Sequence, residues 1–378
     1  MRQEVYIEKG FLNTLEEVLC KGDFRHIFLV TGKSSYTLSG AKLAMEKILK
    51  TYDVTRYCEF DPNPQLPDVE RGLKLFLERK YDAVIAVGGG SVLDVAKLIR
   101  ICAVQETSPR EIIDDSQHIQ QRGVPLIAVP TTAGSGSEAT HFAVVYLDKN
   151  KHSVAHEYVL PDVAIVESEL TNSMPPEITA ATGMDALSHA IESYWSIHST
   201  LESKEYARKS IGLTLNNLES AVNRPSKESR ESMATAAHFA GKAINISRTT
   251  ACHALSYAMT SFHGIPHGHA VGLTLPFMVE YNVGVEQDDV LDKRGVGYVR
   301  QTMKDLLELL GQNSAQGASA KLAELMQRIG LSRKLRDLNI RESDLDNIVQ
   351  QGLASDRANC NPRLLSEEAL RKNLISII

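Results

Sequence analysis

Residues 83–97 read AVIAVGGGSVLDVAK, and this stretch is the clearest indication of the fold of the first half of the chain. An apolar β-rich run is followed by three glycines, a serine and a helical pattern. Three consecutive glycines remove every Cβ at the turn, so backbone N–H groups and the helix N-terminus can approach a diphosphate closely. A tight strand-to-helix turn without a ligand would use the same residues. The stretch is not the GxGxxG fingerprint of a standard Rossmann fold, so it predicts an α/β domain with a phosphate-binding turn of another kind.

The alternation of strand and helix extends on both sides of this stretch. Buried strands are indicated at residues 27–31, 83–87, 126–129, 143–147 and 163–166, and helical periodicity at residues 39–51, at 67–79 and from 93 onward. Near-continuously apolar strands that alternate with helices are typical of a parallel sheet covered on both faces. We therefore expect a dinucleotide-binding α/β domain with a parallel sheet over residues 1–174.

The sequence pattern changes at Ser173-Met174-Pro175-Pro176, which is typical of a helix start. Beyond it, helical patterns dominate and β-branched clusters are scarce. The helical stretches are residues 177–196, 201–222, 228–246, 252–262, 299–310, 318–329 and 342–353. We expect an all-helical second domain over residues 175–378.

Composition excludes several classes of protein. Over 378 residues the net charge is −6, which is too mild for a surface that binds nucleic acid or a membrane. Five cysteines without a CxxC pair argue against a disulfide framework and favour the reducing cytoplasm. No apolar run reaches the roughly 18 residues of a membrane-spanning helix, and the N-terminus lacks a signal-peptide pattern. We expect a cytoplasmic protein whose partner is a small molecule.

A second loop rich in donors follows the strand at residues 126–129. Residues 130–140 read PTTAGSGSEAT, in which Thr131, Thr132, Ser135 and Ser137 surround two glycines. Small hydroxylated residues also make ordinary loops. Two such loops at strand ends of one sheet nevertheless favour a nucleotide site.

Residues 31–36, TGKSSY, bear on the choice of cofactor. An acidic residue at this strand end would bind an adenosine ribose 2′-OH and repel a 2′-phosphate. Here Gly32 leaves space, while Lys33, Ser34 and Ser35 supply positive charge and donors. A surface loop would explain the same residues. The pattern favours NADPH within an NAD(P)H-linked enzyme.

Asp185, His189, His253 and His267 form the candidate metal site. Asp185 and His189 are four residues apart in a helical pattern and so share one helix face. His253 and His267 are fourteen apart, the second after a Gly-Ile-Pro break. One carboxylate and three imidazoles suit a divalent iron or zinc ion with room for a substrate oxygen. Four protein ligands would also suit a closed structural site, in a nucleotide- or metal-binding protein without catalysis.

Four segments resemble the iron-containing (group III) alcohol dehydrogenase family: residues 88–97, 130–140, 160–194 and 253–273. The resemblance covers essentially the whole chain. It implies an N-terminal dinucleotide-binding domain with a C-terminal helical metal domain, as in the dehydroquinate synthase-like architecture, and usually an oligomer, here a homodimer. It also implies an Fe²⁺ site at Asp185, His189, His253 and His267. Its cofactor contacts map onto Gly88, Gly89, Gly90, Ser91 and Asp94 for the diphosphate, Thr131, Thr132 and Ser135 on the nicotinamide side, and Lys151 at the nicotinamide ribose.

The chain departs from the family in one place. Many members have a histidine four residues after the third ligand, and this position is Tyr257 here. Proton delivery during the reaction can then pass through Tyr257, His263, His269 or water.

The reaction implied by the resemblance is hydride transfer between nicotinamide and a small aldehyde or alcohol. Residues 241–273 and 359–370 resemble the phosphonoacetaldehyde reductase branch, whose substrate is anionic. Cations and hydroxyls suited to such a substrate precede His253 or lie near the C-terminus, at Lys242, Arg248, Thr249, Thr250, Arg357 and Arg363. Solvated surface positions are the alternative for these residues. The alternative activities are those of a 4-hydroxybutyrate or general aliphatic alcohol dehydrogenase, a glycerol or glycerol-1-phosphate dehydrogenase, and a 3-dehydroquinate synthase.

Overall fold

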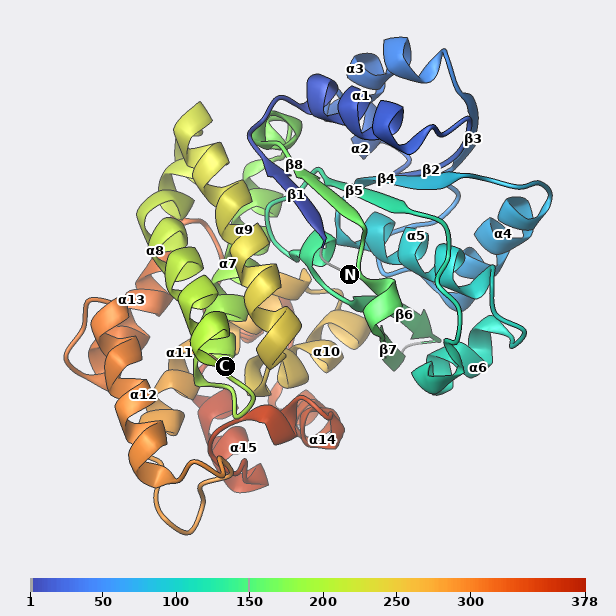
Figure 1. Cartoon of the computed structure of the whole chain (residues 1–378). Helices are drawn as coiled ribbons and strands as arrows, with labels where there is room; N and C mark the ends of the chain where they lie inside the picture. The colour runs from blue at the N-terminus through green and yellow to red at the C-terminus, as the bar shows by residue number, and fades with distance from the viewer. Residues whose placement is uncertain (1–2, 149) are drawn as a thin grey trace. The chain divides into compact units, whose positions relative to one another are not determined.

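The computed structural model describes residues 3–148 and 150–378 of the chain (Figure 1). Two compact units make up the molecule, Met1–Met174 and Pro175–Ile378. Within the described ranges, no helix combines the length and the apolar character needed to cross a membrane.

The first unit is built on a six-stranded sheet in the order β1-β8-β5-β4-β2-β3, and every strand pairing in it is parallel. Its strands are β1 (Glu4–Ile7), β2 (His26–Thr31), β3 (Asp53–Tyr57), β4 (Ala83–Gly88), β5 (Leu126–Pro130) and β8 (Val163–Val166). The helices of this unit are α1 (Phe11–Gly22), α2 (Ser35–Leu38), α3 (Ala41–Leu49), α4 (Leu66–Leu77), α5 (Gly90–Cys102) and α6 (Pro109–Asp114). The parallel α/β fold expected for this half is confirmed.

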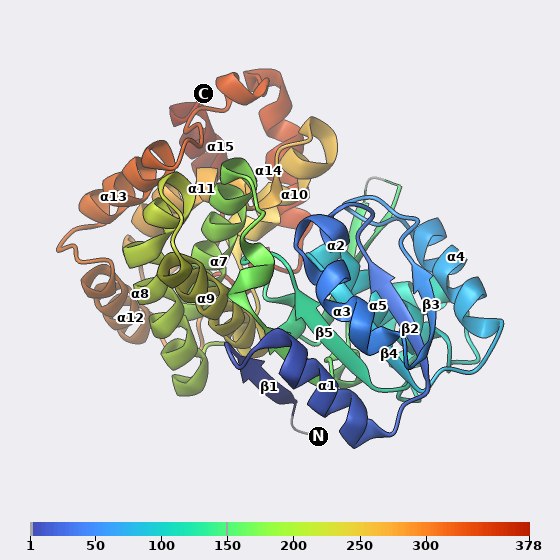
Figure 2. The same ribbon diagram turned by 90° about the horizontal axis from the view of Figure 1, so that it is seen from above.

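Helices cover both faces of the sheet, and the strand residues alternate between two apolar cores. Ile27 and Leu29 of β2 pack with α1 and α3, whereas Phe28 and Val30 pack with α4 and α5. Figure 1 shows α1 and α3 on one side of the central strands and α5 on the other, and Figure 2 views the sheet from the side of α1 and α3. Strands buried on both faces have no polar side, which explains the unbroken apolar runs in the sequence.

One predicted strand of the sheet lies elsewhere. Residues 143–147 belong to β6 (Phe142–Leu147), which pairs antiparallel with β7 (Asn150–Ala155) in a separate two-stranded sheet. An apolar run shows that a strand is buried but not which strand it pairs with. The strands β1, β3 and β7 were not predicted, because each carries exposed polar residues.

The second unit is helical, as expected. Its helices are α7 (Pro176–Trp195), α8 (Leu201–Asn223), α9 (Lys227–Ser247), α10 (Ala251–His263), α11 (His267–Val283), α12 (Val296–Leu309), α13 (Ala315–Arg328), α14 (Leu345–Ala354) and α15 (Glu367–Ser376). The start of α7 follows the prediction, with Pro175 as N-cap and Pro176 as the first helical residue. Two helices were not predicted, α11 and α15. The predicted helix at 342–353 instead begins with a 3₁₀ turn at Glu342–Asp344.

Candidate metal centre and nucleotide-binding loops

The four predicted metal ligands come from three helices. Asp185 and His189 lie one turn apart on α7, His253 lies in the first turn of α10, and His267 is the first residue of α11. Between the last two, Gly264 ends α10 in a left-handed conformation at φ 68°, and Pro266 caps α11. This break turns the chain so that the N-terminus of α11 returns towards α7.

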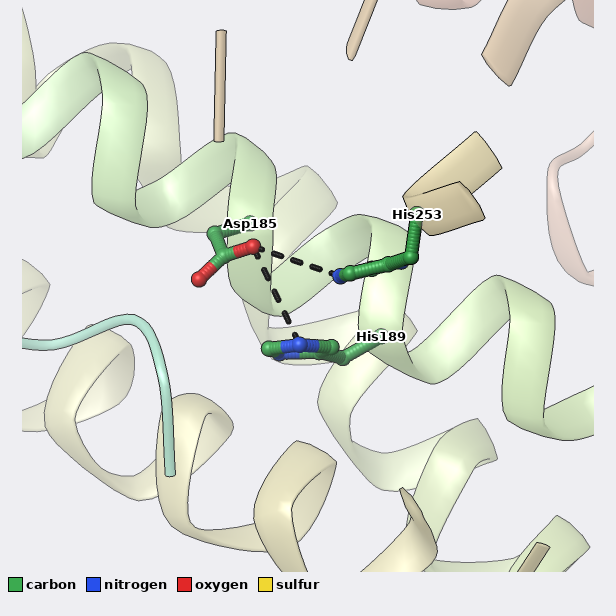
Figure 3. Close-up of side chains that lie close together, drawn as sticks. All are labelled: Asp185, His189 and His253. Carbon is green, nitrogen blue, oxygen red and sulfur yellow. Dashed lines mark ion pairs between the residues drawn. The ribbon is translucent and has the colours of Figure 1, made fainter. Parts of the chain in front are cut away.

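Asp185 stands at the centre of this group (Figure 3). Its Oδ1 lies 3.8 Å from Nε2 of His189, 3.5 Å from Nε2 of His253 and 3.9 Å from Nε2 of His267. The side chains of Asp185, His189 and His253 lie close enough to hold one metal ion together. His267 is the outermost of the four, with its side chain 28% exposed.

A close helix contact makes this approach possible. A Cβ at Gly268 would lie 2.0 Å from the carbonyl oxygen of Ala181 and 2.7 Å from Cβ of Asp185. Only glycine fits there, because both neighbours belong to the rigid turn of α7 that carries the carboxylate. Gly268 therefore sets the position of His267 beside Asp185.

The electrostatics of the group favour a cation. Burial opposes ionisation of Asp185, but His189, His253 and His267 outweigh it, and the pKa of Asp185 falls well below its usual range. Burial lowers the pKa of His253, yet Glu192 and Asp185 more than compensate and raise that pKa to about 9. A buried carboxylate among imidazoles thus attracts positive charge, whether protons or a metal ion.

The residues fit a divalent ion. Oδ1 of Asp185 and Nε2 of His253 are both buried, and neither has a hydrogen-bond partner within residues 3–148 and 150–378. Leaving such atoms unpaired is costly, and a metal ion would satisfy both. Iron and zinc both accept one carboxylate with imidazoles, so the donor set suits the predicted metals.

Glu192 supports this centre and was not singled out from the sequence. It lies on α7, three residues after His189, and is fully buried. Its carboxylate contacts Nδ1 of His253. The spacing Asp185, His189 and Glu192 places all three on one face of the helix, and this was the signal available in the sequence.

The predicted phosphate-binding turn joins β4 to α5. The helix begins at Gly90, with Gly89 as N-cap in an extended conformation. A Cβ at Gly89 would lie 3.3 Å from the Thr132 side chain, and one at Gly90 would lie 2.8 Å from Oγ of Ser135. The glycines therefore let the two predicted loops pack against each other at the carboxyl edge of the sheet, beside the N-terminus of α5.

A buried lysine holds the second loop in place. Lys97 of α5 is fully buried, and its Nζ donates to the carbonyl oxygens of Ser137, Thr140 and Phe142 at 2.7, 2.9 and 2.7 Å. This role of Lys97 was not predicted from the sequence, because its partners lie 40 or more residues away along the chain.

Asp94 supports the second loop through two hydrogen bonds. Its carboxylate accepts from Oγ of Ser137 at 2.7 Å and from the backbone N–H of Val144 at 3.2 Å. Burial raises the pKa of Asp94, and the positive charges of Lys97 and Lys151 oppose that rise. These bonds give Asp94 a role in supporting the loop, and its predicted contact with the cofactor stays a prediction.

Lys151 and Ser91 lie beside these loops. Lys151 is on β7 opposite Tyr146, and its charge acts on Asp94. Ser91 is in the first turn of α5, where its Oγ accepts from the backbone N–H of Asn63 at 3.4 Å. The N-cap of α5 is Gly89, and Ser91 makes no capping hydrogen bond in the described part of the chain.

The predicted cofactor-selecting segment is contacted by an arginine of the neighbouring strand β3, which was not singled out from the sequence. Lys33 forms an exposed ion pair with Asp61 at 2.7 Å, so its charge is already matched. Arg56 of β3 instead reaches the end of β2. Its Nε donates to Oγ1 of Thr31 at 2.8 Å, and its Nη2 donates to the carbonyl oxygen of Gly32 at 3.2 Å. Ser34 is the N-cap position of α2 in this segment.

Of the three predicted proton donors, one lies beside a metal ligand. The ring of Tyr257 stacks with that of His267, with centroids 6.3 Å apart. His263 ends α10 ten residues after His253, which is about 15 Å along a helix. The ring of the buried His269 bonds the carbonyl oxygen of Ser332 at 2.8 Å. The geometry therefore favours Tyr257 and argues against His263 and His269.

The predicted substrate residues separate into two groups. Nζ of Lys242 lies over the Tyr206 ring at 4.2 Å, and Arg363 bonds Asp289 at 2.6 Å and the carbonyl oxygen of Tyr281 at 2.7 Å. These two side chains hold the fold, so the structure does not support their predicted role. In the second group, exposed Arg248 and buried Thr249 lie just before α10, and Arg357 lies just before the 3₁₀ turn at Ala358–Cys360.

A dinucleotide-type α/β unit and a helical unit with a carboxylate–imidazole centre define a metal-dependent dehydrogenase. Comparison with family models supports this class. The model "Iron-containing alcohol dehydrogenase" matches residues 2–168, and "Fe-containing alcohol dehydrogenase family, C-terminal" matches residues 179–377. The chain belongs to the iron-containing alcohol dehydrogenase family, and it is therefore an oxidoreductase.

Individual relatives differ in their substrates. The chain is 34% identical to long-chain-alcohol dehydrogenase 1 of Geobacillus thermodenitrificans, over 81% of this chain and 77% of that protein. It is 32% identical to phosphonoacetaldehyde reductase of Streptomyces viridochromogenes, over 82% of this chain and 80% of that protein. The solved structure of sulfoacetaldehyde reductase from Bifidobacterium kashiwanohense in complex with NAD⁺ matches with a TM-score of 0.89 at 29% identity, over 99% of this chain and 96% of that one.

Proposed function

We propose that this enzyme reduces a small anionic aldehyde, with phosphonoacetaldehyde first among the candidates and succinic semialdehyde second, and that it uses NADPH. The observation that carries the substrate class is the conformation of Arg248. This residue directly follows α9 at φ 62° and ψ 172°, a region that is essentially restricted to glycine. Such strain costs about 1–3 kcal/mol and tends to persist where function requires the side chain.

Arg248 lies in the chain just before the helix that carries His253. Its side chain is exposed, and the segment that follows it, through buried Thr249 and Thr250, leads directly into the helix of His253. Burial raises the pKa of the Cys360 thiol, and Arg357 and Arg248 oppose that rise, so both guanidinium groups lie near this one buried side chain. Two relatives named above act on two-carbon aldehydes that carry a phosphonate or a sulfonate.

The metal ion would be held by Asp185, His189, His253 and His267. When bound, it supplies Lewis-acid stabilisation of negative charge on the substrate oxygen during hydride transfer. The family favours iron, although zinc generally binds more tightly to any given set of ligands. The protein's own contribution is to orient the ligands, to hold the anionic end of the substrate at Arg248 and to provide a proton.

Tyr257 is our proposal for the proton-handling group, because its ring lies against His267. Tyr257→Phe keeps the ring and removes the hydroxyl. We expect kcat to fall about 100-fold, with the affinity for metal unchanged. Unchanged kcat and an unchanged solvent isotope effect would assign proton delivery to water.

NADPH is favoured by the end of β2. Gly32 offers no carboxylate to repel a 2′-phosphate, and Arg56 is anchored there by Thr31 and by the backbone of Gly32. An arginine in such a place can accommodate a 2′-phosphate.

The substrate is tested by kcat/KM for phosphonoacetaldehyde, succinic semialdehyde and propanal in Arg248→Gly. Glycine removes the charge and also relieves the backbone strain. We expect kcat/KM for phosphonoacetaldehyde to fall about 10- to 100-fold, propanal reduction to be unchanged and the variant to be about 1 kcal/mol more stable. Arg363→Ala is the control, since Arg363 is engaged by Asp289.

An equal loss for all three aldehydes would overturn the assignment of Arg248. Preference of the unaltered enzyme for a long aliphatic aldehyde would instead support the activity named for the Geobacillus relative. If chelation of the metal leaves aldehyde reduction intact, the ion is structural and the proposed chemistry fails.

A further inference from the structure

Glu192 occupies an unusual position for a carboxylate, since it is fully buried within the helical unit. Every described hydrogen bond to its side chain comes from residues 250–253, which form the junction of α9 and α10. Oε1 accepts from Oγ1 of Thr250 at 2.7 Å and from the backbone N–H groups of Thr250, Cys252 and His253 at 3.2, 2.8 and 3.4 Å. The other oxygen, Oε2, faces Nδ1 of His253.

These contacts divide the carboxylate into two functions. Oε1 takes the place of an N-cap for α10, because it accepts from N–H groups that have no partner within the helix. Oε2 is an acceptor only, so Nδ1 of His253 must carry its proton towards it. The lone pair of the neutral imidazole is then on Nε2, the atom that lies 3.5 Å from Asp185.

We propose that Glu192 is a positioning residue that fixes His253 as an Nε2 ligand and anchors the segment carrying Arg248. This inference rests on the proposed metal centre and deepens it. The same carboxylate that sets the imidazole tautomer also bonds Thr250, two residues after Arg248. Neighbouring contacts immobilise the junction further, since Oγ of Ser196 donates to the carbonyl oxygen of Ser247 at 2.6 Å. A segment over-determined in this way can keep the strained backbone of Arg248.

The contact pattern makes Glu192→Gln a sharp test. Three N–H groups and a hydroxyl converge on the Oε1 position, so the amide oxygen of glutamine must stay there. Its NH₂ group then occupies the Oε2 position and donates to Nδ1 of His253. The ring proton moves to Nε2, and the ligand atom is blocked although the side chain has almost the same shape.

The experiment measures Zn²⁺ and Co²⁺ affinity of the purified full-length protein after chelation and reloading. Loss of such a support typically costs 10- to 100-fold in metal affinity, and we expect this for Glu192→Gln, with a changed Co²⁺ absorption spectrum. Glu192→Asp keeps a carboxylate and should lose less affinity than Glu192→Gln. Asp162→Asn is the matched control, because this carboxylate of the other unit also bonds an arginine and a backbone N–H group. Its metal affinity should equal that of the unaltered protein.

Metal affinity of Glu192→Gln within threefold of the unaltered protein would overturn the inference, as would a greater loss in Glu192→Asp. If Glu192→Gln does not fold, Glu192→Asp carries the test: it must bind Zn²⁺ more weakly than Asp162→Asn does. The proposed function fails separately, if the unaltered protein binds the metal but does not reduce anionic aldehydes with NADPH.

Discussion

Lys97 in the α/β unit and Glu192 in the helical unit have similar structural roles but opposite charges. Both are fully buried charges that gather a distant segment around a functional site. The ammonium group of Lys97 collects carbonyl oxygens from residues 137–142, whereas the carboxylate of Glu192 collects N–H groups from residues 250–253. The sign of each charge matches the backbone atoms that need a partner.

The difference lies in what each charge shapes. Lys97 supports a loop whose backbone and hydroxyls form the predicted nucleotide site. Glu192 orients one imidazole, and the site it serves consists of side chains. We therefore expect variants of the first unit to act through the shape of a loop, and variants of the second to act through single ligand atoms.

The largest effect is expected for His189→Ala, which removes one ligand atom from the helical unit. We expect kcat/KM to fall about 100- to 1,000-fold, because the charge on the substrate oxygen loses its stabilisation. Binding of NADPH to the α/β unit, followed by its fluorescence, should be unchanged. A parallel loss of NADPH affinity would show that the two sites are not independent, which would contradict the expected difference between the two units.

Lys97→Met should affect the α/β unit and leave the metal site unchanged, with a smaller effect than that of His189→Ala. Two buried carbonyl oxygens and one partly buried carbonyl oxygen lose their donor, so we expect the free energy of unfolding to fall by about 3 kcal/mol. Calorimetry measures this loss, and titration with NADPH should show weaker binding. Zn²⁺ affinity should match that of the unaltered protein. A variant as stable as the parent would mean that the loop keeps its shape without the ammonium group.

The smallest effect is expected for Arg56→Gln. This variant tests whether a single side chain also matters in the α/β unit, where the predicted site consists mainly of loop backbone and hydroxyls. The ratio of kcat/KM with NADPH to that with NADH should fall about tenfold, because one charge-assisted contact is lost. Lys33→Ala is the control and should change the ratio little, since Lys33 is paired with Asp61. The opposite ranking of the two variants would return the assignment to Lys33.

The central strands were predictable because burial on both faces leaves them uniformly apolar, as in residues 83–87 and 126–129. The edge strands were not, because DVTRY of β3 mixes exposed and buried positions. The antiparallel partner of β6 is NKHSVA, whose first residues are polar. Pairing depends on a distant segment, and an apolar run of five residues carries no information about it.

The same reasoning separates the site residues. Asp185 and His189 could be paired from the sequence because their spacing is one helical turn. Glu192 shares that face, but its meaning depends on Thr250 and Cys252, 58 and 60 residues further on. Arg56 is likewise defined by its contact with Thr31, 25 residues earlier. Local periodicity finds residues on one element, whereas supporting contacts join elements far apart in the chain.

The predicted metal ligands lie on α7, α10 and α11, and this distribution has a consequence for folding. An ion bound to all of them is a cross-link between three helices and closes loops of the chain much as disulfides do. Its binding free energy is then also folding free energy. The metal ion that serves the reaction would also stabilise the helical unit, and we expect cells short of that metal to accumulate a looser, more protease-sensitive chain.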